Sequence, residues 1–438
     1  MKRTYHESYL SRNPRALLSR VASFSLKRRH AVFAGILVAV LGLFIVSCVL
    51  TASEANVGRA VAQSVLDVQG AAGPAPESPG VYANAAVLLD ASSGRVLYEK
   101  NAHEALPIAS TTKILTALVV REQLDLKDGI TISPEAAAVG EQAINLVPGE
   151  KLTVEQLLYA LLVHSANDAA YALAQYTAGS PESFANLMNK KAKQLGAREG
   201  NFTNPHGLDE SGHYSTAYDL AVLGRSLMED PVLARMVQTK KYDIPLPGQP
   251  YPRTCINHNE ILNEYPGATG IKTGYTGAAG RCLVASATRG EESLVATVLN
   301  SEYRARDVSA LFDYGFAKLE PVTLLKAGQK VGETMVSAYP KRNVKAVPQG
   351  EIRAVSVKGA GDMFQLRTAV VRKAAGSVKK GDALGKVDYS LNGKPSGRSK
   401  VVSATSEKKP GVFESAAVFV WYSLCLMGRI LSAPFRIF

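Results

Sequence analysis

Cysteine is scarce in this chain, with four residues in 438. Cys48 and Cys425 lie in apolar segments toward the two ends, and only Cys255 and Cys282 lie in the central part. Two cysteines make no disulfide framework, so we expect two separate buried thiols. No Cys-x-x-Cys or His-Glu-x-x-His pattern occurs, and the sequence therefore predicts neither a metal site nor a cofactor.

The chain also lacks an even distribution of charge. Its formal net charge is +12, yet residues 31–318 carry an excess of acidic side chains. Residues 1–30 hold eight Lys/Arg and one Glu, and residues 319–410 hold eighteen Lys/Arg and seven acidic residues. No helix-turn-helix or RNA-binding signature accompanies these basic regions. They favour an anionic membrane or wall polymer over nucleic acid as the partner.

Long uncharged runs are rare, and residues 31–50 are a stretch of twenty residues without a charge. A helix of that length can span a bilayer. Because the basic segment 1–30 precedes it, we expect a cytoplasmic N-terminus and folded domains on the extracytoplasmic side of the cell membrane. Residues 31–52 are either an uncleaved anchor or a signal sequence cut near Ala55. The run is long for a signal sequence, which favours the anchor.

The rest of the chain divides into four parts by composition. Residues 53–80 are rich in Ala, Gly, Pro and Ser, as is typical of a linker. Residues 81–318 mix helical periods with short apolar strands, which predicts an α+β domain with an antiparallel sheet. Residues 319–403 alternate β-prone runs with Gly- and Lys-rich turns and predict a small all-β domain. Residues 404–438 start with a charged linker and then become apolar.

Several elements of the α+β domain can be placed from the sequence. Apolar runs at 86–90 and 95–99 flank an Ala-Ser-Ser-Gly turn and predict a hairpin. Thr153 and Gln156 have the spacing of a capping box and predict the start of a helix. The further strands predicted for this domain are 270–274, 283–287 and 294–299.

Ser110 and Lys113 begin a segment that is apolar almost all round, which indicates a helix buried at the centre of a domain. Side chains three residues apart share one face of a helix. A serine at a helix N-terminus lies beside free backbone N–H groups and the positive end of the helix dipole. A lysine one turn later can take the serine proton if burial or a second cation lowers its pKa from ~10.4 toward 7. The two residues can therefore act as nucleophile and base.

The same Ser-x-x-Lys spacing occurs twice more, at Ser377 with Lys380 and at Ser406 with Lys409. Both pairs lie in Lys-rich β or linker sequence, where solvated charge is expected. Ser110 differs because it alone opens a long apolar helix. The spacing by itself is weak evidence, and the context selects Ser110.

Two further short motifs hold residue types that suit a polar cleft. Ser165 and Asn167 fall on a break between two helices, where the hydroxyl can relay a proton and the amide can hold a carbonyl. On a strand, Lys272 can point a charge into a cleft while Gly274, on the same face, lets a substrate backbone approach. Taken alone, the first motif fits an inter-helix loop and the second an edge strand with a glycine bend.

Together and in this order, Ser-x-x-Lys, Ser-x-Asn and Lys-Thr-Gly resemble the signature of penicillin-binding proteins and serine β-lactamases. The runs 165–170, 204–209, 213–220 and 270–276 are similar to those of low-molecular-mass D,D-carboxypeptidases. The resemblance covers about residues 81–316 and extends less specifically through the β domain and the C-terminal tail. It implies a penicillin-binding/serine β-lactamase-like transpeptidase domain followed by a small all-β domain.

The resemblance assigns roles residue by residue. Ser110 would be the acylated nucleophile and Lys113 its base, with the backbone N–H groups of Ser110 and Tyr275 as the oxyanion hole. Arg306 is similar, after a one-residue shift, to an arginine that assists carboxylate binding. His206 and His213 are expected to order loops. The catalytic residues implied are Ser110, Lys113 and Ser165, and the substrate-binding residues are Asn167, Lys272, Thr273, Gly274, Tyr275 and Arg306.

The activity implied is that of a D,D-carboxypeptidase, which removes the terminal D-alanine from peptidoglycan pentapeptide stems and is inhibited covalently by β-lactams. Alternatives are a D,D-endopeptidase on cross-links, a serine β-lactamase and a non-catalytic binding protein. β-Lactamases of the commonest similar class need a Glu-x-x-Leu-Asn loop, and residues 259–263 lack the glutamate at its first place. The β domain and the tail favour carboxypeptidase over endopeptidase. Three intact motifs argue against a non-catalytic protein, and the sequence indicates no oligomeric state.

The C-terminal segment 412–438 is predicted to lie along the membrane without crossing it. Its apolar stretch 415–427 has thirteen residues without a charge, which makes about 20 Å of helix against a hydrocarbon core of ~30 Å. Arg429 and Arg436 are two helical turns apart and share a face. An apolar body with basic residues on one side suits the headgroup boundary. The alternative is a helix buried against the β domain.

Overall fold

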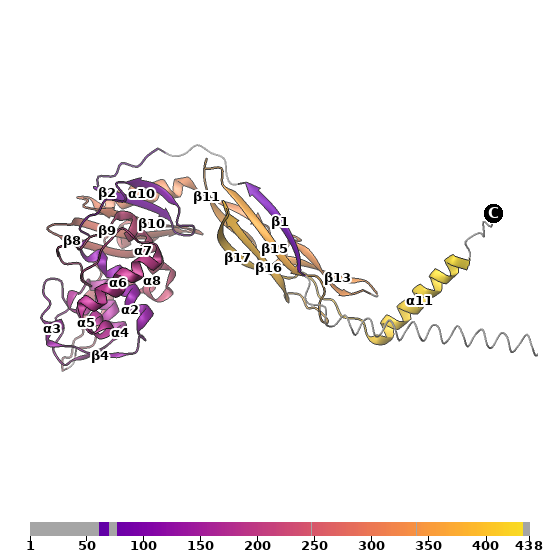
Figure 1. Cartoon of the computed structure of the whole chain (residues 1–438), viewed down its shortest axis with the longest axis horizontal. Helices are drawn as coiled ribbons and strands as arrows, with labels where there is room; N and C mark the ends of the chain where they lie inside the picture. Colours follow the sequence, from indigo (N-terminus) through magenta and orange to yellow (C-terminus); the bar gives the residue numbers. More distant parts are fainter. Residues whose placement is uncertain (1–60, 70–76, 247, 339, 432–438) are drawn as a thin grey trace, which may run out of the picture.

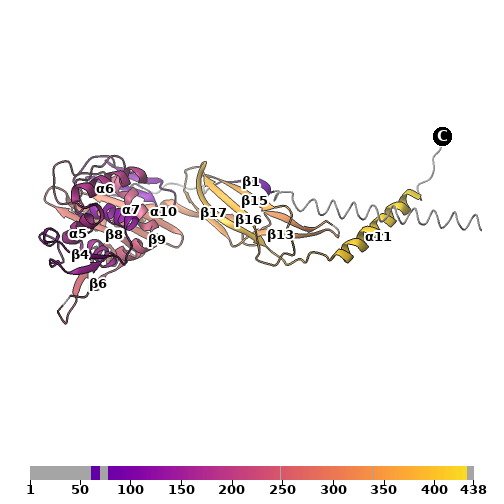
Figure 2. The same cartoon turned by 60° about the horizontal axis from the view of Figure 1, so that its bottom comes forward.

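The computed structural model describes residues 61–69, 77–246, 248–338 and 340–431. They form an α+β domain, an elongated all-β domain beside it and a C-terminal helix that projects away from both (Figures 1 and 2). This is the order of domains predicted from the sequence. The predicted basic segment 1–30 and membrane segment 31–52 lie outside the described residues.

A five-stranded antiparallel sheet forms the centre of the α+β domain, in the order β3-β2-β10-β9-β8. Its strands are β2 (Ala85–Asp90), β3 (Val96–Lys100), β8 (Ala268–Thr276), β9 (Gly280–Arg289) and β10 (Glu292–Leu299). β2 and β3 form the predicted hairpin, and the three other predicted strands lie within β8, β9 and β10. β8 is an edge strand, so its outer edge is available to a neighbour.

Helices cover both faces of this sheet, because alternate residues of a strand point to opposite sides. In β2, Val87 and Leu89 join the core on the side of α2 (Lys113–Gln123), while Leu88 joins the core on the side of α10 (Arg304–Lys318). The helical segments between the strands are η2 (Ala109–Thr112), α3 (Pro134–Ala137), α4 (Val154–Tyr159), η3 (Ala160–His164), α5 (Asn167–Ala178), α6 (Pro181–Leu195), α7 (Ala217–Glu229), α8 (Pro231–Gln238) and α9 (Ile261–Glu264). Short strand pairs complete the domain: β4 (Gly129–Thr131) with β5 (Lys151–Thr153), and β6 (Lys241–Ile244) with β7 (Arg253–Ile256).

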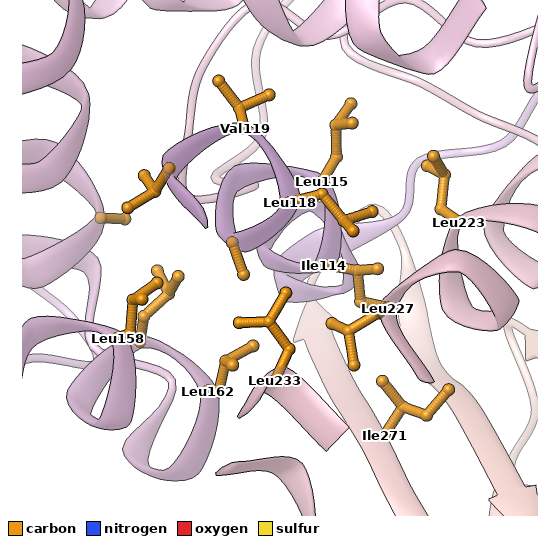
Figure 3. Packing of buried hydrophobic residues seen from close by; sticks show 14 of the residues in the cluster. Ile114, Leu115, Leu118, Val119, Leu158, Leu162, Leu223, Leu227, Leu233 and Ile271 are labelled. Carbon is orange, nitrogen blue, oxygen red and sulfur yellow. The ribbon is translucent and has the colours of Figure 1, made fainter. Parts of the chain in front are cut away.

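Helix α2 is the centre of the larger core, as its all-round apolar sequence predicts. Figure 3 shows Ile114 and Leu118 of α2 among side chains from η3, α7, α8 and β8. Full burial of each such side chain stabilises the fold by roughly 1.5–3 kcal/mol. This packing holds the N-terminal end of α2, which begins at Lys113, and the preceding η2, which contains Ser110, in a fixed place.

Two local predictions in this domain are confirmed. Thr153 and Gln156 form a complete capping box at the start of α4. Cys255 in β7 and Cys282 in β9 are both buried and free.

The β domain contains a six-stranded sheet in the order β1-β15-β16-β17-β13-β12, with β11 and β14 paired separately. The strands are β1 (Val61–Gln69), β11 (Leu319–Leu325), β12 (Gly332–Ser337), β13 (Arg342–Pro348), β14 (Ile352–Val357), β15 (Met363–Val371), β16 (Ala383–Leu391) and β17 (Lys394–Ser403). Its core is small and apolar, with Val344, Phe364 and Val387 among the fully buried residues.

Strand β1 corrects one prediction, because it lies inside the segment 53–80 that was expected to be a linker. All nine of its residues pair in antiparallel register with β15, for example Ser64 opposite Thr368. Most of its side chains are exposed, and Val68 packs partly on the core. An edge strand of this kind is held mainly by backbone hydrogen bonds, which composition does not reveal.

The two domains are joined by polar contacts at the β2–β3 hairpin and at the end of α10. The Arg95 guanidinium lies 2.6 Å from the buried carboxylate of Asp362. The Lys358 ammonium of the β domain donates to the carbonyl oxygen of Ala317 in α10, at 3.0 Å. Asp362 also accepts a hydrogen bond from the backbone N–H of Val357, so one carboxylate links the hairpin to a β-domain turn.

Helix α11 (Val412–Leu431) follows the β domain, and the side chains of its residues 412–425 are largely exposed. Phe413 is 93% exposed and Trp421 63%. The alternative of a helix buried against the β domain is therefore wrong. Among the described residues, no helix combines the length and the apolar character needed to cross a membrane.

Candidate active site

Ser110 lies on a tight turn that two glycines approach closely. The preceding residue, Ala109, has a φ of +49°. A Cβ at Gly207 would lie 2.0 Å from the Ala109 carbonyl oxygen, and a Cβ at Gly274 would lie 3.1 Å from the Ser110 nitrogen. The loop around Gly207 and the edge strand β8 therefore both reach the backbone of the turn. The missing side chain of Gly274 makes room for the turn itself, and the approach of a substrate backbone at this glycine stays a prediction.

The Lys113 ammonium nitrogen is the centre of a short hydrogen-bond network. It lies 2.7 Å from Ser110 Oγ, 2.8 Å from Asn167 Oδ1 and 2.7 Å from the carbonyl oxygen of His206. The Asn167 amide is oriented by its Nδ2, which donates to the Gly140 carbonyl at 3.1 Å. A neutral amine has two N–H groups and one lone pair, and the oxygens of Asn167 and His206 can only accept. In the neutral state the lone pair therefore faces Ser110 Oγ, which donates its proton.

The electrostatics of the site favour that neutral state. Burial, and next the positive charge of Lys272, lower the pKa of Lys113 well below its ordinary value, against the opposing effect of Asp168 and Glu141. The same causes act on Lys272, where burial and the charge of Arg304 lower the pKa to about 7. Two buried lysines so placed cannot easily be charged together.

The Lys-Thr-Gly motif lies on β8, directly beside the Ser110 turn. Lys272 is buried, and its ammonium donates to the Thr273 carbonyl at 2.9 Å. Thr273 is half-buried, and Tyr275 is 69% exposed, opposite Arg281 of β9. The third motif and the first thus meet in space although Lys272 follows Ser110 by 162 positions in the sequence.

Ser165 lies between η3 and α5 with a φ of +67°, so the predicted break between the helices is present. Its side chain is partly exposed. Within the described part of the chain, no hydrogen bond joins its hydroxyl to Ser110 or Lys113. Its neighbour Asn167 reaches Lys113 directly, and the motif therefore contributes one side chain to the network and one to the surface beside it.

Arg306 is not at the site, which corrects the prediction for this residue. Its guanidinium lies over the Tyr82 ring, 5.1 Å from the ring centre. Arg304 instead reaches β8, with Nη1 3.3 Å from the Gly274 carbonyl oxygen. Residues two apart on a helix point about 200° away from each other, so only one of the two arginines can face the sheet.

His206 and His213 order the surrounding loops, as predicted. His213 Nδ1 accepts from the Thr203 backbone N–H at 3.1 Å, so Nε2 carries the proton and donates to Thr112 Oγ1 at 2.8 Å. Thr112 Oγ1 in turn donates to the Ala109 carbonyl at 2.8 Å. Burial lowers the pKa of His213 to about 4, which keeps it neutral in this role.

Besides Arg304, three contributions to the site were missed by sequence reasoning. Thr112 fixes the carbonyl before Ser110, and the backbone carbonyl of His206 binds Lys113. Asp168, directly after Asn167, accepts from the backbone N–H of Leu146 at 3.0 Å. A backbone acceptor leaves no trace in the sequence, whereas the adjacency of Asp168 to the Ser-x-Asn motif was a usable signal.

The two other Ser-x-x-Lys pairs have structural roles. Ser377 Oγ accepts from the backbone N–H of Lys409 at 3.0 Å, and Ser406 Oγ accepts from that of Lys380 at 2.9 Å. All four residues are exposed. Their serines hold the two segments together, and among the described residues no hydrogen bond joins either hydroxyl to a lysine ammonium.

Comparisons with known proteins agree with this geometry. Residues 72–303 match the family model described as D-alanyl-D-alanine carboxypeptidase, and residues 319–409 match the C-terminal domain of penicillin-binding protein 5. The D-alanyl-D-alanine carboxypeptidase DacF of Bacillus subtilis is 34% identical over 75% of this chain and 87% of its own length. DacC of Escherichia coli, named for the same activity, is 35% identical over 78% of this chain and 89% of its own length. The crystal structure of penicillin binding protein 5 from Haemophilus influenzae superposes with a TM-score of 0.54 at 29% identity, covering 76% of this chain and 99% of that one.

Proposed function

Because the chain belongs to the D-alanyl-D-alanine carboxypeptidase family, we propose that Ser110 and Lys113 carry out the reaction of that family. The protein is a serine D,D-carboxypeptidase that acts on peptidoglycan stem peptides and binds β-lactams. One observation carries the assignment of residues: the Lys113 nitrogen lies 2.7 Å from Ser110 Oγ. The other two hydrogen-bond partners of the Lys113 nitrogen, the oxygens of Asn167 and His206, can only accept hydrogen bonds. The family supports this activity over the endopeptidase and β-lactamase alternatives.

In the acylation step, Ser110 Oγ attacks the carbonyl carbon of the penultimate D-alanine while its proton passes to Lys113. The backbone N–H groups of Ser110 and Tyr275 receive the developing oxyanion. The C–N bond then breaks, and the leaving D-alanine nitrogen takes a proton from Lys113 or through the Ser165 hydroxyl. Water attacks the acyl-enzyme with Lys113 again as base, which releases the shortened stem and restores Ser110.

Substrate recognition is assigned to β8 and its neighbours. Lys272 and Thr273 would receive the terminal carboxylate of the stem peptide. Arg304 takes the assisting role first expected of Arg306. An ammonium group attracts a carboxylate only while it is protonated, so the pKa of Lys272, about 7, matters for binding.

The test of the nucleophile is covalent labelling with fluorescent penicillin, followed by intact-mass spectrometry and peptide mapping. The wild-type protein should gain one penicilloyl group on Ser110, and Ser110→Ala should gain none. Ser377→Ala and Ser406→Ala are matched controls and should label like the wild type. An adduct on any other serine contradicts the assignment.

We also propose that the protein resides at the cell membrane, with its catalytic domain on the extracytoplasmic side and α11 along the outer surface. The support is the uncharged run 31–50, together with the exposed aromatic side chains of α11. Trp and Tyr suit the boundary between headgroups and acyl chains. The β domain would then be a spacer that holds the active site toward the wall.

Removal of α11 tests this placement. Two proteins lacking residues 1–55 should be compared by flotation with vesicles containing anionic lipid, one ending at Pro410 and one ending at Phe438. Only the longer protein should float with the vesicles. If the longer protein stays fully in solution, α11 is no anchor, and a label at Phe438 that is reachable only from the cytoplasm would reveal a crossing.

A further inference from the structure

Glu260 forms a bidentate ion pair with Arg304. Arg304 Nε lies 2.7 Å from one carboxylate oxygen of Glu260, and Nη2 lies 3.0 Å from the other. Glu260 stands directly before α9, and Arg304 is the first residue of α10. The side chains are only 29% and 14% exposed, so this pair is shielded more than an ordinary surface pair.

The other contacts of Arg304 are weaker than those with Glu260. Nη1 lies 3.3 Å from the Gly274 carbonyl oxygen and 3.4 Å from that of Cys282, at the long end of hydrogen bonding. The bonds to the carboxylate are shorter and charge-assisted, hence stronger. Four of the five N–H groups of a guanidinium are thus engaged. Without Glu260, two long bonds to neutral carbonyls would have to hold the guanidinium against its solvation by water.

The position of Arg304 matters because its charge acts on Lys272. Lys272 lies on β8, and Gly274 of the same strand contacts the Ser110 turn. The charged or titratable groups that act electrostatically with Lys272 are Lys113 of α2, His164 of η3 and Arg304 of α10. Of these, arginine alone stays charged at every working pH.

We propose that Glu260 is a positioning residue for recognition of the substrate's terminal carboxylate: it holds Arg304 against Gly274 and Cys282, and so fixes a permanent positive charge beside Lys272. The inference rests on the proposed function, in which Lys272 meets that carboxylate. A fixed cation beside Lys272 makes its protonation harder, so carboxylate binding should weaken as the pH rises through the range near 7. If Arg304 is released to solvent, Lys272 should keep its proton to higher pH.

The test is the pH profile of kcat/KM for a diacylated tripeptide ending in D-Ala-D-Ala. For Glu260→Ala and for Arg304→Gln, the alkaline limb should move to higher pH by about one unit, the usual effect of losing a nearby like charge. The double variant should move no further, because both changes remove the same fixed cation. Glu264→Ala is the matched control: this glutamate is exposed on the same short helix, and its profile should equal the wild type.

Glu260→Asp separates position from charge. It keeps the carboxylate but is one methylene too short for the bidentate contact, so the limb should move in the same direction by a smaller amount. The proposal is overturned if the alkaline limb of the kcat/KM profile stays at the wild-type pH in Glu260→Ala but moves in Arg304→Gln. A shift to lower pH would also overturn it, since Glu260 would then act through its charge alone.

Labelling with fluorescent penicillin distinguishes a failure of the Glu260 proposal from a failure of the proposed function. Glu260→Ala, Glu260→Asp and Glu264→Ala should still form the Ser110 adduct and show a cooperative thermal transition. If the wild type forms no adduct, the proposed function fails, whatever the pH profiles show. If these variants form the adduct and Glu260→Ala has the wild-type profile, only the role of Glu260 fails.

Discussion

The catalytic domain and the β domain contain the same Ser-x-x-Lys spacing in opposite surroundings. In the catalytic domain, Lys113 is fully buried, and its nitrogen contacts Ser110 Oγ. In the β domain and the linker after it, Lys380 and Lys409 are exposed, and the serines of the motifs bond to their backbone nitrogens instead. The comparison teaches that a reactive serine needs a desolvated lysine with a second cation nearby, and that the spacing alone supplies neither.

The largest effect is expected from Lys113→Arg. Guanidinium stays charged and cannot accept the Ser110 proton, so the acylation rate with fluorescent penicillin should fall by roughly 10²–10⁴-fold, the range for loss of a general base. Lys380→Arg makes the same change in the β domain and should leave the rate unaltered. A Lys113→Arg protein that folds and acylates at the wild-type rate would place the base elsewhere.

Acid should unfold the two domains differently, because the β domain, residues 319–403, contains no histidine. Burial lowers the pKa of His213 to about 4, and burial with the charge of Lys113 lowers that of His206 to about 3. An unfolded histidine takes up its proton near 6.5, so the unfolded state binds more protons below that pH. The catalytic domain should therefore lose stability as the pH falls from 6.5 to about 4, by ~3 kcal/mol for His213 alone.

In the β domain, by contrast, the carboxyl groups of Asp362 and Asp388 have lowered pKa values. At Asp362, burial raises the pKa, and hydrogen bonds to the carboxylate lower it by more. At Asp388, the hydrogen bond from Arg398 is the largest cause of the lowered pKa. Their stabilisation should be lost only as the pH falls below about 4. Hydrogen exchange of the full chain at pH 7, 5.5 and 4.5, corrected for intrinsic rates, should show earlier loss of protection in the catalytic domain. His213→Gln should reduce that difference, and equal loss in both domains would contradict the prediction.

Arg95→Ala tests how far the two domains depend on each other. The substitution removes the ion pair with Asp362, whose carboxylate keeps its bonds to Val357 and Asn392. Because Arg95 is about one-third exposed, we expect a loss of only about 1 kcal/mol. Calorimetry should then show the unfolding of the domains separating, with acylation of Ser110 unchanged. A single transition at the wild-type temperature would mean that this contact does not couple the domains.

The smallest effect on activity is expected from cross-linking β1 to its neighbour β15 with a disulfide. Ser64 and Thr368 are direct partners on adjacent antiparallel strands, so Ser64→Cys with Thr368→Cys should form a disulfide. Ser64→Cys with Arg367→Cys is the control, because a shift of one residue turns the side chain to the other face. Intact mass after alkylation under oxidising conditions distinguishes the two. D,D-carboxypeptidase activity should not change, and equal bridging in both pairs would contradict the register.

Prediction from sequence succeeded where the signal is local and failed where it depends on distant partners. The hairpin of β2 and β3, the capping box at Thr153 and the central helix α2 all follow from patterns within a few residues. Strand β1 was missed because its partner, β15, is about 300 residues away and its own side chains are mostly exposed. Arg306 was chosen over Arg304 because the sequence does not show which side of α10 faces the sheet.

By itself, the sequence determined the chemical groups of the site and the order of the domains, since motif identity and hydrophobic period are properties of short segments. Tertiary structure decided which serine lies beside a buried lysine. Lys113 is buried, the charge of Lys272 on β8 acts on it, and the His206 carbonyl accepts a hydrogen bond from it. These three residues come from distant segments of the chain. It also decided that Arg304 is the arginine at β8 and that Glu260 holds it there. The physical reason is that desolvation and charge coupling act through space over a few ångströms, and only the folded chain fixes those distances.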